Sequence, residues 1–188
     1  MKQFDIEIAG GKRGILLHNP AGQMGQKGVR KSSEGSVPTS EAEAAAGLYW
    51  MPDKSSISFP ADNLHSALIA ASSGMKIKRL SLAPFISGSI EIAPDDIPFH
   101  TKKYEVDIRR AVVQRQGILR ARPLLSPWKL NFSILVEDDF PVLDVENTLR
   151  ALLEIAGGRI GIGDYRPQRR GRFGKFKVVS IREVSNGR

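Results

Sequence analysis

A strict alternation of apolar and polar residues between positions 128 and 136 constrains the fold most strongly. Its apolar members, which fall on one face of an extended chain, are Trp128, Leu130, Phe132, Ile134 and Val136. Residues 3–9 alternate in the same way, and residues 14–18 are expected to continue that strand after a glycine-rich bend. Both segments predict strands that turn one face to the core.

Two helices and two more strands are predicted around this pair. The first helix follows Pro60, with Asp62 or Asn63 as its cap and apolar residues spaced three and four apart: Leu64, Ala67, Leu68 and Ala71. The second helix begins at its cap, Asp144, and ends at Gly157. Residues 83–93 and 174–184 predict the remaining strands, with Gly88 as a weak point or bulge of the former.

The order strand, helix, strand, strand, helix, strand predicts the α+β class. It is the split βαβ pattern of the ferredoxin-like, RRM-like fold, an antiparallel sheet with both helices on one face. We expect one domain over residues 1–188, with insertions at about 19–60 and 95–126. The first insertion is expected to hold a mobile loop, 19–39, then a helix with a Ser40–Glu43 capping box and two short strands at "LYWM" and "SISF" around a turn.

The second insertion predicts a projecting basic hairpin. Extended runs at 103–113 and 118–122 flank a Gln-Gly turn. Its candidate nucleic-acid contacts are Arg109, Arg110, Arg120 and Arg122, with Lys102, Lys103 and Arg115 nearby. Alternate residues of a strand share a face, so Arg120 and Arg122 point together while Arg109 and Arg110 diverge. A charged edge that prevents aggregation is the alternative interpretation.

The charge of the chain favours an anionic partner. It has 28 basic and 20 acidic residues, a net charge of +8, and 41% hydrophobic residues, which indicates a folded protein with a basic surface. The bases concentrate at 102–129 and 159–177. Cysteine is absent, which excludes disulfides and thiolate metal sites, and the N-terminus lacks an apolar run, so a cytoplasmic location is expected.

The stretch "GGRIGIGDYRPQRRGRFGKF", residues 157–176, is the second basic region. A P-loop is excluded because Arg169 stands where its first glycine is needed and Phe176 where its hydroxyl is needed; a dinucleotide fingerprint fails at Arg166. The remaining interpretation is a phosphate-binding loop in which the Tyr165 ring is available to stack on a base. Its candidate cations are Arg159, Arg166, Arg169, Arg170, Arg172 and Lys175, and the glycines expected to let the backbone approach a ligand are Gly161, Gly163, Gly171 and Gly174. Phe173 and Phe176 are expected in the core, and a solvated connection is the alternative for the whole stretch.

No residue pattern predicts a metal, a cofactor or a catalytic triad. His18, His65 and His100 are far apart in sequence and lack the spacing of metal ligands. His18 and His100 are weak candidates for general acid–base catalysis.

Two segments resemble a known family. "PADNLHSALIAA", preceded by "SISF", and "GIGDYRPQRRGRFGKF" before the last strand are similar to the repeat-associated (RAMP) superfamily of CRISPR systems, in particular to backbone subunits of class 1 effector complexes. The ending also looks like that of short uncharacterised phage-encoded proteins. The chain is shorter than those subunits, and Ala61-Asp62 stands where the family has Gly-Ser. The resemblance implies an RRM-like fold, binding of single-stranded nucleic acid along the sheet and the glycine-rich loop, and self-association along the strand.

Three functions are therefore open. The first is non-catalytic binding of single-stranded RNA or DNA, with filament formation or other complex subunits as partners. The second is a RAMP-type RNA-processing endonuclease. The third is a protein-interaction or inhibitor module whose arginine-rich arms bind another protein.

Overall fold

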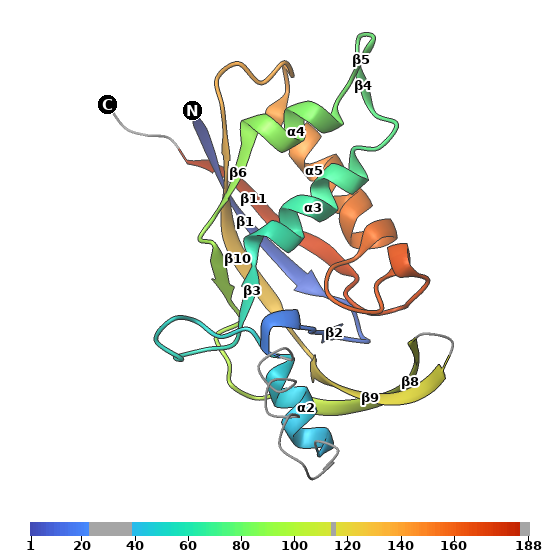
Figure 1. Cartoon of the computed structure of the whole chain (residues 1–188). Coiled ribbons are helices and arrows are strands. Elements are labelled where there is room, and N and C mark those ends of the chain that lie inside the picture. Colours follow the sequence, from blue (N-terminus) through green and yellow to red (C-terminus); the bar gives the residue numbers. More distant parts are fainter. Residues whose placement is uncertain (23–38, 114–115, 185–188) are drawn as a thin grey trace.

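A four-stranded antiparallel sheet forms the centre of the computed structural model, which describes residues 1–22, 39–113 and 116–184 (Figure 1). Its strand order is β11-β1-β10-β6. The strands are β1 (Lys2–Gly10), β6 (Ile90–Ala93), β10 (Lys129–Val136) and β11 (Phe176–Val184). The fold is thus mixed, with helices packed on antiparallel sheets.

The register of the sheet separates a buried face from an open one. Phe4 pairs with Ile134, and Ile6 pairs with both Phe132 and Ile181, so alternate residues of three strands enter the core. The predicted alternation of residues 3–9 and 128–136 is confirmed, and Trp128 is buried just before β10.

Three helices cover the buried face (Figure 1). They are α3 (Ala61–Ala71), α4 (Ala83–Ser89) and α5 (Val145–Ile155). Helix α3 buries Leu64 and Leu68, as its spacing predicts, and α5 buries Leu149 and Leu152. Asp144 caps α5 as predicted, because its side chain accepts a hydrogen bond from the Asn147 amide.

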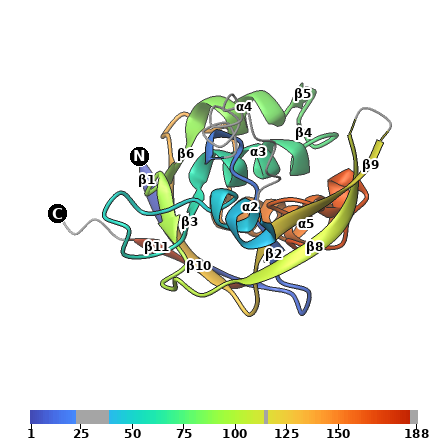
Figure 2. The same cartoon turned by 60° about the horizontal axis from the view of Figure 1, so that its bottom comes forward.

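A second sheet lies against one end of this core (Figure 2). Its order is β2-β9-β8, formed by β2 (Ile15–Leu16), β8 (Glu105–Val113) and β9 (Gln116–Leu125). Strands β8 and β9 are the predicted basic hairpin. Helix α2 (Ser40–Ala46) packs against β9. Two small two-stranded sheets, β3 (Ser58–Pro60) with β7 (Asp96–Pro98) and β4 (Lys76–Ile77) with β5 (Leu80–Ser81), complete the described strands.

Two predicted strands are wrong in part. Residues 83–89 are helix α4 instead of strand, and only Ile90–Ala93 pairs with β10. Proline is tolerated in the first turn of a helix, where Pro84 lies, and Ile86 is the buried residue of α4. Residues 14–18 do not continue β1, because Gly14 turns the chain at φ 73° and Ile15–Leu16 pairs with β9.

Three predicted helix ends are also wrong. Helix α2 is capped by Thr39, whose side chain accepts from the Ala42 amide, instead of by a Ser40–Glu43 box. Pro60 precedes α3 without a side-chain cap. Gly157 does not end the second helix: a π-helical turn, Ala156–Ile160, follows α5 and ends at Gly161. Gly157 instead lies against β11, where a Cβ atom would be 2.2 Å from the Phe176 carbonyl oxygen.

The first insertion is described only in part. Tyr49 and Trp50 form no strand, only a single bridge between Trp50 and Ile57. Most of the loop expected at 19–39, together with Arg115, lies outside the described residues. Within the described part of the chain, no helix has the length and apolar character needed to span a membrane.

Candidate nucleic-acid interface

The glycine-rich loop, defined here as residues 161–175, joins the π-helical turn after α5 to β11. Backbone hydrogen bonds fix both of its ends: the Ile162 amide donates to the Gly174 carbonyl at 3.0 Å, and the Gly174 amide donates to the Gly14 carbonyl at 2.9 Å. A 3-10 turn, Pro167–Arg169, forms its tip. The loop therefore has a defined conformation that is anchored to the rest of the fold.

The glycines of this loop serve its own packing. A Cβ atom at Gly171 would lie 1.6 Å from the Tyr165 carbonyl oxygen, and one at Gly174, where φ is 67°, would lie 1.7 Å from the Ile162 carbonyl oxygen. Gly161 and Gly163 also have protein atoms within 3 Å of the position of a Cβ. The close backbone approaches that require these glycines are thus made to the protein itself.

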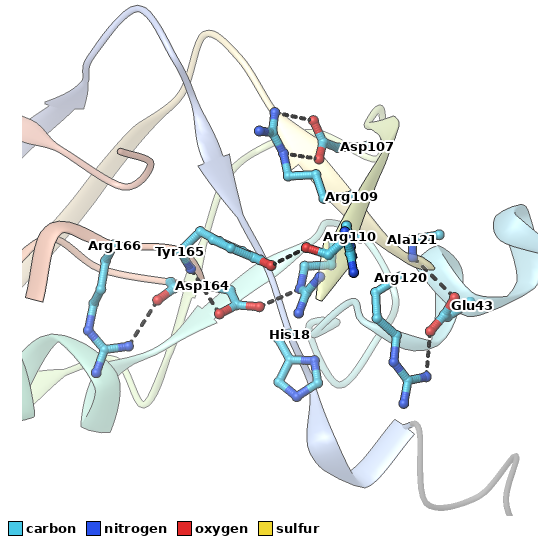
Figure 3. A network of polar contacts seen from close by, with 12 residues as sticks. His18, Glu43, Asp107, Arg109, Arg110, Arg120, Ala121, Asp164, Tyr165 and Arg166 are labelled. Carbon is cyan, nitrogen blue, oxygen red and sulfur yellow. Dashed lines mark hydrogen bonds and ion pairs between the residues drawn. The ribbon is translucent and has the colours of Figure 1, made fainter. Parts of the chain in front are cut away.

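One face of the β8–β9 hairpin packs on the glycine-rich loop (Figure 3). The register places Arg109 opposite Arg120 and Asp107 opposite Arg122, so these four side chains share that face. Arg122 forms an ion pair with Asp164 and lies over the Tyr165 ring, 4.9 Å from its centre. Arg109 lies 4.5 Å from the centre of the Phe173 ring. The hairpin and the loop, predicted separately, form one unit.

Three of the four candidate arginines of the hairpin already have acidic partners. Besides the Arg122–Asp164 pair, Arg109 binds Asp107, and Arg120 binds Glu43 of α2 at 2.7 Å. Glu43 also accepts the Ala121 amide at the edge of β9. Arg110 diverges onto the opposite face, as predicted, and its carbonyl accepts a hydrogen bond from the Tyr165 hydroxyl at 3.0 Å.

The cations of the loop have a different environment. Four of them, Arg169, Arg170, Arg172 and Lys175, are exposed and form no ion pair with a carboxylate of the described chain, and the same holds for Arg159 in the π-helical turn before the loop. Arg166 is half-buried, and it donates to the Gly163 carbonyl and the Gln168 side chain. Phe173 and Phe176 are buried, as predicted.

Two further cations join this surface. Lys12 and Arg13 are exposed in the turn between β1 and β2. The Gly11 amide donates to the Lys175 carbonyl at 2.8 Å, which fixes the turn beside the loop. The sequence predicts a glycine-rich bend here, but only the tertiary pairing of Gly11 with Lys175 brings its cations beside the loop.

A cavity of about 420 Å³ opens between the loop and α3. Its polar lining residues are His18, Tyr49, Asn63, Ser66, Asp164, Arg166, Gln168 and Arg169. Both segments that carry the family resemblance, residues 59–71 and 161–176, contribute to its wall. Sequence reasoning missed Tyr49, Ser66 and Gln168, because they come from three segments that are far apart in the chain.

The two candidate histidines are placed differently. His18 lines the cavity near the Arg122–Asp164 pair, whereas His100 is an exposed residue with φ 55° after β7 and does not line it. Desolvation lowers the pKa of His18; Arg122 and Arg120 lower it further, and Asp164 and Glu43 oppose the shift. In the described residues no three His, Asp or Glu side chains are grouped to hold a metal ion.

The open face of the four-stranded sheet is polar. Asp5 and Glu7 of β1 lie beside Asn131 and Ser133 of β10 and Arg182 of β11. Glu7 pairs with Lys129 at 2.8 Å. RRM-type sheets stack bases on aromatic side chains, and this face of the described strands carries none. The described strands of this face therefore offer no aromatic ring on which a base could stack.

Comparison with known proteins shows the fold. No family model matches the sequence, and no curated protein matches it. A chain in the cryo-EM structure of the type III-B Cmr-beta bound to cognate target RNA is similar in structure, with a TM-score of 0.61 and 13% identity over 97% of this chain. The match spans 60% of that chain.

Proposed function

We propose that this protein binds single-stranded RNA without cleaving it, along the glycine-rich loop and the adjacent β1–β2 turn. The observation that carries the proposal is the set of exposed cations at Arg169, Arg170, Arg172 and Lys175, which have no acidic partner in the described chain. Exposed guanidinium and ammonium groups that have no acidic partner are available to the phosphates of a single strand.

The comparison supports RNA over DNA. The similar structure contains RNA. A separate observation supports the RRM-like fold of the proposal: the strand order β11-β1-β10-β6, with α3 and α5 on one face, agrees with the ferredoxin-like pattern. On this proposal the protein is a RAMP-type subunit of a CRISPR-like or phage nucleoprotein complex. Single-stranded DNA is the natural competitor for testing the choice of polymer.

The test is fluorescence anisotropy with a labelled single-stranded RNA at increasing KCl. The logarithm of the association constant should fall steeply and linearly with the logarithm of salt concentration. Unlabelled RNA should compete better than DNA of the same sequence. A flat salt response, or no binding at low salt, would remove the proposal.

Assembly with another protein subunit is the second part of the proposal. The outer face of the hairpin exposes Val106, Ile108 and Leu119, and the register places all three on the same side. Neighbouring exposed apolar side chains on one strand face favour a protein contact. Native mass measured with and without RNA should reveal self-association, and Leu119→Asp should abolish it.

Cleavage of RNA is a second candidate because of one observation. His18 lines the cavity beside Arg166 and Arg169, and a lowered pKa keeps its imidazole neutral and able to accept a proton. Defined products from labelled RNA incubated with EDTA, lost in His18→Ala, would establish this activity in place of simple binding.

A further inference from the structure

The cavity between α3 and the glycine-rich loop has the features of a site for a single nucleobase. Its volume of about 420 Å³ falls within the range of about 300–1,000 Å³ of small-molecule sites. We propose that one base of the bound RNA leaves the stack and enters this cavity, so that the protein reads base identity at one position. This inference rests on the proposed function, because the strand must first bind along the loop.

The geometry separates a phosphate side from a base side. Arg169 is both a lining residue and one of the exposed cations without an acid. Arg166 donates to Gln168, so it orients that amide at the wall. A phosphate held by Arg169 would therefore leave its own base at the mouth of the cavity.

The opposite wall supplies a ring and hydrogen-bonding groups. The Tyr49 hydroxyl donates to the His18 carbonyl at 2.8 Å and also interacts with the Asn63 side chain, which fixes the ring. Asn63 and Ser66 lie one turn apart on α3, on the same side of the helix. Amide and hydroxyl groups of this kind pair with the Watson–Crick edge of an unstacked base.

The charge of the lining fits a nucleotide. The carboxylate in the wall, Asp164, is already bound by Arg122 and by the Tyr165 amide. The remaining charges of the lining are the cations Arg166 and Arg169. The cavity therefore attracts an anionic nucleotide unit.

The test compares the four 12-residue RNA homopolymers by anisotropy at one salt concentration. We expect the wild-type protein to bind the best and the worst of them with affinities about tenfold apart. Asn63→Ala with Gln168→Ala should reduce that spread to below about threefold and leave the salt slope unchanged. Arg170→Gln is the matched control: it should weaken all four polymers alike and leave the spread intact.

A second measurement needs no substitution in the protein. One abasic position in the best homopolymer should change affinity little, whereas a fully abasic 12-mer should bind no better than the worst homopolymer. AMP, CMP, GMP and UMP as competitors show whether the cavity takes a free nucleotide or only a base of a bound strand. If a wild-type spread survives in the double variant, or if all homopolymers bind equally, the base site is wrong while RNA binding stands. If no homopolymer binds, the proposed function itself fails.

Discussion

The two basic regions of this protein differ in what their arginines contact. In the β8–β9 hairpin, Arg109, Arg120 and Arg122 each have a carboxylate partner. In the glycine-rich loop, Arg169, Arg170 and Arg172 have none in the described chain. Similar density of positive charge in sequence thus produces two different surfaces.

We expect this difference to give the two sets of arginines different roles, one in stabilising the fold and one in binding an anion. A guanidinium that already has a carboxylate partner gains less from a phosphate, because the existing ion pair must first be broken. An exposed guanidinium has no such cost. In the hairpin, Arg122 and Arg109 contact the loop, through Asp164 and the Phe173 ring, and Arg120 contacts Glu43 of α2. On the proposed function, the loop arginines are the ones that bind an anion.

Replacing Gly174 by alanine should have the largest effect. Its φ of 67° and the Ile162 carbonyl oxygen, 1.7 Å from the position of a Cβ, leave no room for a side chain. We expect a loss of about 3 kcal/mol or more in the free energy of unfolding, measured in urea. Gly158→Ala is the control, because nothing lies within 4 Å of its Cβ position. Equal stability of the two variants would mean that the loop is not built as described.

Removing the carboxylate that joins hairpin and loop should come next. Asp164→Asn leaves Arg122, whose side chain is only 13% exposed, without an acid. The expected loss is about 2 kcal/mol in the free energy of unfolding. Asp139→Asn removes an exposed carboxylate that has no ion-pair partner among the described residues, and it should change stability by less than about 0.5 kcal/mol. If Asp164→Asn left the free energy of unfolding unchanged, the ion pair would not couple the hairpin to the loop.

The salt dependence of RNA binding should distinguish the two regions. The quantity compared is the slope of the logarithm of the association constant against the logarithm of the salt concentration. Arg169→Gln with Arg172→Gln should reduce the slope by about 1.4, since each phosphate contact on a single strand contributes about 0.7. Glu43→Gln with Arg120→Gln removes a hairpin ion pair as a unit and should leave the slope unchanged. Similar reductions in both double variants would contradict the distinction.

The smallest effect should appear in the pH dependence of stability. Because the pKa of His18 is lowered below 6.5 on folding, the unfolded chain binds more protons in that window. The free energy of unfolding should therefore be unaffected by His18 above pH 6.5. It should decrease as the pH falls from 6.5 toward the pKa of His18 in the folded protein. Urea unfolding at pH 7.5, 6 and 5 measures this, and His18→Gln should flatten the change between the first two values. The same slope in wild type and variant would exclude His18 as its cause.

The sequence predicted elements with a clear period and failed where tertiary contacts decide. The alternation in β1 and β10 and the Leu64–Leu68 spacing in α3 fixed those elements correctly. Residues 83–89 were wrong because a short apolar run fits strand and helix equally. The division into one domain with insertions at 19–60 and 95–126 stays a prediction.

The candidate site shows the same limit. The basic residues were found from composition, but which of them have acids depends on Glu43 and Asp164, residues 77 and 42 positions from their partners. The cavity was not predictable, since its wall joins the segment after β2, helix α3 and the loop. The site residues remain proposals that binding data must test.

The affinity for single-stranded RNA of two variants with the same loss of charge tests the central claim most directly. Arg169→Gln should weaken binding at low salt by about threefold to tenfold, as expected for the loss of one phosphate contact. Arg120→Gln should stay within about twofold of wild type, because its guanidinium is held by Glu43. If Arg120→Gln weakens binding as much as Arg169→Gln or more, the hairpin is part of the binding surface and the account is wrong.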